Sequence, residues 1–210
     1  MGRSRLVDRA FLAATLVFGA TAFVALVVLT LVARDPGFTS ASLVYGASLV
    51  ACTLFSFLYN TNEATRWRPW LRYLDHASIF LLIAGTYTPF GATGMDGPIH
   101  GSLLTWVWCL AIAGMALKLF LPKSFDRLFV GVYVALGWVF VTAADDALRC
   151  IPVAPLILLG LGGLAYTVGA CIFARDIGRW TDPVWHGCVL AGIVMHFTAV
   201  ITFALSPGIA

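Results

Sequence analysis

The chain has 210 residues, of which 60% are hydrophobic and only 11% are charged, with a formal net charge of +3. Ordinary soluble domains carry roughly 25% charged residues, and a soluble domain this apolar would expose large aggregation-prone patches. Composition therefore excludes a soluble globular enzyme and indicates an integral membrane protein, with membrane lipid rather than nucleic acid as the expected partner. The apolar runs are about 20 residues long, which is typical of membrane helices and not of barrel strands.

The predicted fold is all-α, with seven transmembrane helices in a single domain covering residues 1–210. Each apolar segment reaches the length of about 17–25 residues that a helix needs to cross the hydrocarbon core. Pro, Gly and Asp residues separate the segments, as they do at turns. The segments cover residues 10–33, 38–59, 69–90, 101–121, 126–144, 153–174 and 183–205.

The first segment follows three arginines, as the apolar part of a signal peptide would. Its apolar run from Ala10 to Val32 is longer than the 7–15 residues of a signal-peptide core, and no convincing small-residue cleavage site follows it. We therefore interpret it as a retained transmembrane helix.

Lysine and arginine residues are distributed very unevenly between the two predicted sides of the membrane. Only Arg34 and Arg149 fall on one side, and the other eleven fall on the other. Because cytoplasmic loops carry the excess of positive residues, the N-terminus is predicted to be cytoplasmic and the C-terminus to lie outside. The eleven residues are Arg3, Arg5, Arg9, Arg66, Arg68, Arg72, Lys118, Lys123, Arg127, Arg175 and Arg179.

Polar residues recur at the cytoplasmic ends of three predicted helices. Ser56 and Asn60 end the second segment, Asp75 lies about two turns into the third, and Asp182 and His186 begin the seventh. Ionisable groups within membrane helices are expensive to keep and often mark functional sites. We expect these five residues to form one polar site at the same depth of the cytoplasmic leaflet.

Asp182 and His186 are four residues apart, so they share one helix face and could both reach a metal ion. Asp182 followed by Pro183 also has the pattern of an N-cap with proline at the first helical position, so capping is expected as at least part of its role. His186 could instead be an interface histidine bonded to a backbone carbonyl. His196 is rotated by roughly 80° from His186 and is expected to be a hydrogen-bonded core histidine.

Asp75 lies inside a predicted helix and so does not have the position of a cap. Arg72 precedes it by three residues and could pair with it in a structural ion pair; the alternative is a functional carboxylate. Ser56 could bond back to its own helix, and Asn60 could simply end one. The outer Asp145-Asp146 pair is the main competing site and is expected to face water beside Arg149.

Six short motifs make the chain resemble the hemolysin III-like proteins, bacterial relatives of the progestin and adipoQ receptors. They span nearly the whole chain in order, and the Asp-His pair together with Ala-Gly-Thr-Tyr-Thr-Pro is the most specific part. The motifs are Ser56-x-x-Tyr59, Leu74-Asp75-His76, Ile83-Ala-Gly-Thr-Tyr-Thr-Pro89, Tyr133-x-x-x-Gly137-Trp138, Gly162-Gly-Leu-Ala-Tyr166-Thr-x-Gly169, and Trp185-His186 through His196-Phe197.

The resemblance implies a seven-helix fold with a zinc ion near the cytoplasmic side. In the family pattern three histidines hold the zinc, while an aspartate and a serine hold its bound water. Carried over by position, Ser56, Asp75 and His186 match this pattern, but Asn60 and Asp182 stand where two histidines are expected. An oxygen-rich set of this kind is closer to what harder divalent cations accept than to a zinc site.

Two functions are compatible with these residues. The first is a lipid amide or ester hydrolase, which the resemblance of the family to membrane ceramidases favours. In it a metal held by His186, Asp182 and Asn60 activates water, Asp75 acts as base, and Ser56 donates to the oxyanion. The second is a non-enzymatic sensor or regulator of membrane homeostasis with a degenerate metal site. The family name also implies cytolytic activity, but the sequence contains no amphipathic segment that could change from a soluble to a membrane-inserted form. A bacterial cell (inner) membrane is the expected location.

Overall fold

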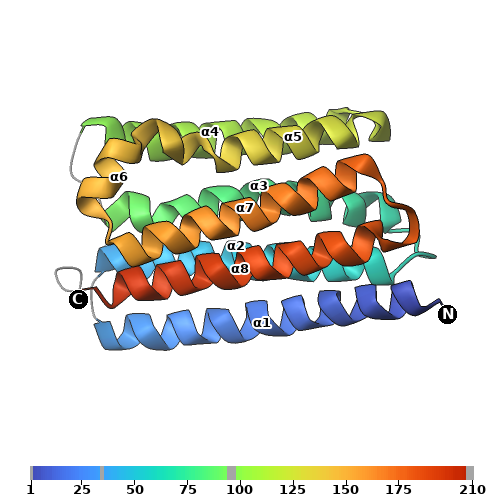
Figure 1. Ribbon diagram of the computed structural model, residues 1–210, viewed down its shortest axis with the longest axis horizontal. Coiled ribbons are helices and arrows are strands. Elements are labelled where there is room, and N and C mark those ends of the chain that lie inside the picture. Colours follow the sequence, from blue (N-terminus) through green and yellow to red (C-terminus); the bar gives the residue numbers. More distant parts are fainter. Residues whose placement is uncertain (1, 34–35, 94–97, 207–210) are drawn as a thin grey trace.

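The computed structural model describes residues 2–33, 36–93 and 98–206, and helices are the regular elements throughout these ranges. The long helices run alongside one another as an elongated bundle (Figure 1). In chain order the elements are α1 (Arg3–Ala33), α2 (Pro36–Thr61), α3 (Arg68–Thr93), α4 (Pro98–Phe120), η1 (Lys123–Phe125), α5 (Asp126–Gly137), η2 (Val139–Ala143), α6 (Ala144–Cys150), α7 (Val153–Arg175), η3 (Gly178–Trp180) and α8 (Thr181–Ala204).

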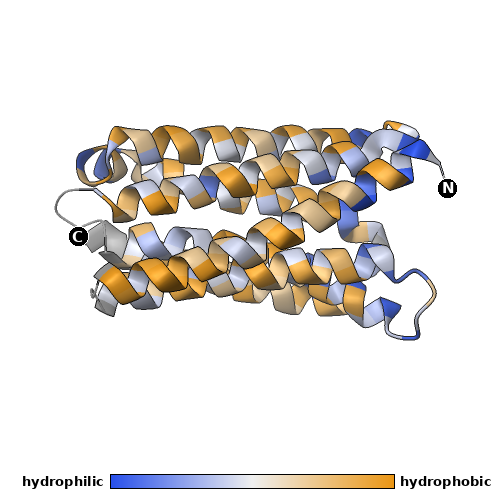
Figure 2. Ribbon diagram, turned by 90° about the horizontal axis from the view of Figure 1, so that it is seen from below, coloured by the Kyte–Doolittle hydropathy of each residue, from blue (hydrophilic) through white to orange (hydrophobic). Residues whose placement is uncertain are grey.

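Six helical stretches within the described residues are long and apolar enough to cross a membrane. Hydrophobic residues occupy much of the length of the bundle, and hydrophilic residues gather mainly at its ends (Figure 2). These features confirm the predicted class of helical membrane protein. The stretches are Arg3–Val32, Gly37–Thr61, Ser102–Phe120, Asp126–Cys150, Val153–Arg175 and Gly178–Ala204.

Helix α3 is long but does not belong to these six, because it combines charged residues in its first turns with the polar Gly-Thr-Tyr-Thr-Pro stretch further along. It packs most extensively against α2 and α4 and also contacts α5 and α8. Phe80 and Ala84 on this helix are completely buried. Protein therefore surrounds much of α3, which allows it to carry polar side chains that a lipid-facing helix would not tolerate.

The positively charged connections lie together in space. The start of α1 and the α2–α3, α4–α5 and α7–α8 connections all lie at one end of the bundle, and α8 ends at the other (Figure 1). Helix α1 begins at Arg3 rather than near the predicted residue 10, so Asp8 is already helical. This end of the bundle contains the polar residues singled out in the sequence.

The third predicted segment, residues 69–90, corresponds closely to α3, which extends a few residues past the proline. Pro89 lies inside α3, which continues to Thr93. The threonines on either side of Tyr87 donate to carbonyls four residues earlier, Thr86 to Leu82 and Thr88 to Ala84. Membrane helices tolerate internal proline because nearby side chains satisfy the backbone groups that it frees.

The fifth segment, predicted as one helix over residues 126–144, is broken after Gly137. The hydroxyl of Tyr87 on α3 fills the break: it lies 2.9 Å from the Gly137 carbonyl oxygen and accepts a hydrogen bond from the Phe140 amide, also at 2.9 Å. The indole of Trp138 donates to Thr167 on α7 at 2.9 Å. The Tyr87 hydroxyl thus satisfies backbone groups at the break, and the Trp138–Thr167 bond ties the same region to α7, both long-range effects that local sequence patterns do not show.

Candidate functional site

Asp75 lies at the centre of the predicted site. Its side chain is 14% exposed and interacts with the Ser56 side chain on α2. It also interacts electrostatically with His186 on α8. The structure therefore brings together three of the five predicted site residues, which come from three different helices.

Arg72 does not form the structural ion pair with Asp75 that the sequence offered as one possibility. Its guanidinium forms an ion pair with Asp126, the first residue of α5, and the ammonium group of Lys118 on α4 contacts the same carboxylate. The Lys118 side chain is only 1% exposed and lies 4.4 Å from the centre of the Phe129 ring. Asp126 thus holds α3, α4 and α5 together and leaves Asp75 without a direct salt bridge to Arg72.

His186 has a partner that the sequence patterns did not suggest. Its Nδ1 atom lies 2.6 Å from a carboxylate oxygen of Asp8 on α1. The two side chains are 9% and 18% exposed, so the contact is largely shielded from solvent. The sequence offered one signal for Asp8, which is an acidic residue among the arginines at the start of a membrane helix. That signal could not reveal that Asp8 contacts His186, 178 residues later in the chain.

The remaining two predicted residues, Asp182 and Asn60, have weaker links to the group around Asp75. Asp182 is exposed near the start of α8 and interacts electrostatically with His186 and Asp8. It is not the N-cap: α8 begins at Thr181, the capping position is Trp180, and no side chain caps the helix. Asn60 donates its side-chain amide to the Ser56 carbonyl of its own helix at 2.9 Å.

The three-imidazole zinc site that the resemblance implies does not fit these residues. His186 is the single imidazole at the three positions; Asn60 offers an amide tied to its own helix, and Asp182 an exposed carboxylate. Among the described residues, no group of three or more His, Cys, Asp or Glu side chains is arranged to hold a metal ion.

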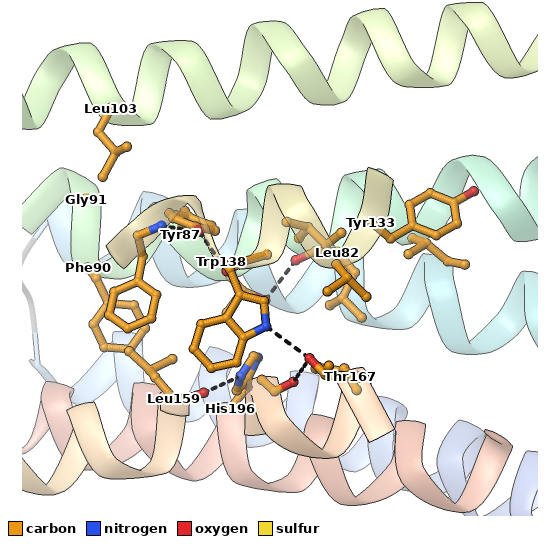
Figure 3. A pocket seen from close by; sticks show the side chains of 18 of the residues that line it. Leu82, Tyr87, Phe90, Gly91, Leu103, Tyr133, Trp138, Leu159, Thr167 and His196 are labelled. Atoms are coloured by element: carbon orange, nitrogen blue, oxygen red, sulfur yellow. Dashed lines mark hydrogen bonds between the residues drawn. The ribbon is translucent and has the colours of Figure 1, made fainter. Parts of the chain in front are cut away.

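An apolar cavity of about 150 Å³ adjoins the polar residues. It lies between α3, α5, η2 and α7, with Tyr133 towards one end and Phe90 and Leu103 towards the other (Figure 3). Tyr133 connects the cavity with the site, because it lines the former, interacts electrostatically with Asp75 and donates to the His76 carbonyl at 3.1 Å. Ile79, one turn beyond Asp75, and Trp185, next to His186, also line the cavity.

His196 and His76 are each bonded to a backbone carbonyl. His196 bonds the Leu159 carbonyl at 3.2 Å and packs edge-on against Tyr166, as predicted for a core histidine. His76 bonds the Arg72 carbonyl at 2.8 Å. Asp145 is exposed in the first turn of α6, far along the chain from the residues around Asp75.

Comparison with known proteins identifies relatives across most of the chain. The family described as "Haemolysin-III related" matches residues 11–197. Hemolysin-3 of Bacillus cereus is 34% identical over 184 residues, covering 86% of this chain and 84% of the relative. The Hemolysin-3 homolog of Bacillus subtilis is 32% identical over 162 residues, covering 77% of this chain and 76% of the relative.

A more distant similarity links the chain to animal proteins. The human monocyte to macrophage differentiation factor is 23% identical over 171 residues, covering 75% of this chain and 67% of the relative. These matches agree with the motif-based resemblance, and together with the six apolar stretches they indicate a multi-pass protein of the bacterial cell (inner) membrane. The chain belongs to the haemolysin-III-related family.

Proposed function

We propose that the chain is a membrane hydrolase that cleaves an ester or amide bond of a lipid near the cytoplasmic surface. The observation that carries this proposal is the position of Tyr133, which lines the apolar cavity and also interacts electrostatically with Asp75. A lipid has the same two-part character, with a polar bond to be cleaved and an apolar chain to be buried. Binding sites of this kind are mostly apolar with a few convergent polar groups.

Asp75 acts as the general base in this proposal. Its carboxylate takes a proton from a water molecule, whose oxygen forms a bond to the carbonyl carbon of the lipid. In the resting site the Ser56 side chain interacts with the Asp75 carboxylate. Once Asp75 is protonated, the Ser56 hydroxyl is free to donate to the developing oxyanion. Asp75 then returns the proton to the leaving oxygen or nitrogen as its bond to carbon breaks, which yields a fatty acid and an alcohol or amine.

Reconstituted protein tests the hydrolase proposal directly. Vesicles would contain either an ester lipid such as phosphatidylglycerol or an amide lipid such as ceramide, and mass spectrometry would measure the released fatty acid. We expect Asp75→Asn to lower the rate by about 10²–10⁴-fold, the usual contribution of a general base. Asp145→Asn, an exposed carboxylate elsewhere, is the matched control and should keep the parental rate. No release above empty vesicles, or an unchanged rate in Asp75→Asn, would overturn the proposal.

A zinc ion or harder divalent cation at Asn60, Asp182 and His186 stays a prediction from the sequence. Elemental analysis of protein purified without added metal tests it. A near-stoichiometric ion that is lost in His186→Gln would support the prediction, and parental protein without metal would contradict it.

The second candidate function is a non-enzymatic sensor or regulator of membrane homeostasis. The presence of Asn60 and Asp182 at two positions where the family pattern has histidine favours it. We expect the double variant Asn60→His/Asp182→His to gain zinc binding, measured by calorimetry in detergent, while parental protein turns over no lipid. Tight zinc binding by the parental protein would contradict a degenerate site.

We also infer seven membrane crossings, with the N-terminus cytoplasmic and the end of α8 outside. The eleven-to-two distribution of Lys and Arg supports this orientation. So does the arrangement of α1 and α8, which begin and end at opposite ends of the bundle (Figure 1). Reporter fusions before Arg3 and after Ala204 should report opposite sides of the membrane, and the same side for both would refute the inference.

A further inference from the structure

The contact between Asp8 and His186 lies partly outside what the family match describes. The match begins at residue 11, so it does not include Asp8, whereas His186 lies within it. The carboxylate comes from the first turns of α1, and the imidazole from the second turn of α8. The N-terminal turns of this chain therefore reach a residue of the candidate site.

The chemistry of the two groups fixes how they are bonded. An ionised carboxylate can only accept hydrogen bonds, so the Nδ1 atom of His186, 2.6 Å from Asp8, must carry the proton that is shared between them. In the neutral imidazole the other ring nitrogen, Nε2, then keeps its lone pair. The hydrogen bond also restrains rotation of the ring, since Asp8 holds one of its edges.

Asp75 lies within electrostatic range of the same imidazole. We propose that Asp8 is a positioning residue: it holds His186 in the tautomer and orientation that present Nε2 as a hydrogen-bond acceptor for the water that Asp75 activates. This inference rests on the proposed hydrolase function for the role of the water. The orientation of the imidazole by Asp8 can be measured without any turnover.

A carboxylate that orients a functional histidine typically matters for activity even though it does not touch the substrate. Loss of the carboxylate partner of a metal-ligating histidine lowers metal affinity or activity on the order of 10- to 100-fold, and we expect a loss of similar size here. Because Asp8 acts on the reaction only through His186 in this proposal, its removal should lower kcat and leave KM within about twofold. A residue that merely joined α1 to α8 would affect stability without changing the tautomer of the ring.

Nitrogen NMR of the full-length protein in lipid nanodiscs tests the inference. The chain contains only four histidines, so ¹⁵N-histidine labelling gives few signals, and His186→Gln identifies those of His186. We expect parental protein to show one tautomer with protonated Nδ1. Asp8→Ala should give a mixture of tautomers, and Asp8→Glu should restore the parental signal at least in part. Asp145→Asn serves as the control and should leave the spectrum unchanged.

The outcomes distinguish this inference from the proposed function. If Asp8→Ala keeps the parental tautomer, or if the parent carries its proton on Nε2, the positioning role is refuted whatever the activity. If the tautomer changes as expected but the parent releases no fatty acid, the hydrolase proposal fails and the orientation of His186 by Asp8 stands. A 10- to 100-fold loss of kcat together with the tautomer change supports both.

Discussion

The close packing of α2 against α3 leads to a specific prediction for Gly85, which lies in the Ala-Gly-Thr-Tyr-Thr-Pro motif. A Cβ atom added at Gly85 would lie 2.9 Å from Cβ of Ser48 and nearer still to its hydroxyl, with the Tyr45 Cα at 3.5 Å. The Ser48 hydroxyl also donates to the Tyr45 carbonyl at 2.7 Å. Gly85→Ala therefore forces both a side chain and a helix backbone to move.

The expected change in the free energy of unfolding follows from three contributions. Overpacking costs about 1–3 kcal/mol, and losing the Ser48 hydrogen bond costs about 1 kcal/mol. Replacing glycine by alanine inside a helix stabilises the folded protein by about 1 kcal/mol. The net destabilisation for Gly85→Ala is thus about 1–3 kcal/mol. Gly131 provides a matched control, because nothing lies within 4 Å of an added Cβ and Gly131→Ala should stabilise by up to about 1 kcal/mol.

Unfolding of the purified protein in detergent, followed by tryptophan fluorescence, would measure these differences. Adding Ser48→Gly to Gly85→Ala should restore most of the lost stability, because it removes the opposing Cβ. Ser48→Ala should restore less, since it removes only the hydroxyl. If Gly85→Ala is as stable as Gly131→Ala, the two helices do not approach each other as closely as described, and the reasoning is refuted.

Two further predictions use the same unfolding assay. Tyr87→Phe should destabilise the protein by about 1–3 kcal/mol, because the Phe140 amide and the carbonyls beside the helix break lose their partner; unchanged stability would mean that other groups satisfy the break. Asp126→Asn should cost about 3–5 kcal/mol, since it leaves the buried Lys118 charge uncompensated. Adding Lys118→Met should recover part of that loss, and no recovery would show that Lys118 is not the group responsible.

The sequence was sufficient to predict the helical membrane class, and it singled out Ser56, Asp75 and His186, which come from three different helices and interact in the structure. Asp75 and His186 stood out because charged and titratable groups are rare in apolar helices, and the charge distribution placed them at one end of the bundle. The prediction that Ser56 shares the site with them depended only on helix direction and depth. These are properties of single segments, which local patterns can reveal.

Pairing between distant segments could not be predicted in the same way. Arg72 has a nearby candidate partner in sequence, yet it pairs with Asp126, 54 residues away, because α5 packs beside α3. Asp8 meets His186 only because α1 packs against α8. The helix break after Gly137 is similar, since Tyr87 from another helix satisfies the exposed backbone groups. Each of these contacts depends on which helices become neighbours.

The enclosed position of α3 has a consequence for how the protein enters the membrane. A helix that carries Arg72 and Asp75 partitions into lipid poorly by itself, as charged residues oppose insertion of an isolated segment. We expect α3 to insert efficiently only together with α2, and glycosylation mapping of α3 alone against an α2–α3 hairpin would measure the difference; equal insertion of both would contradict this expectation. The residues that form the candidate site would then also make biogenesis of the protein depend on a neighbouring helix.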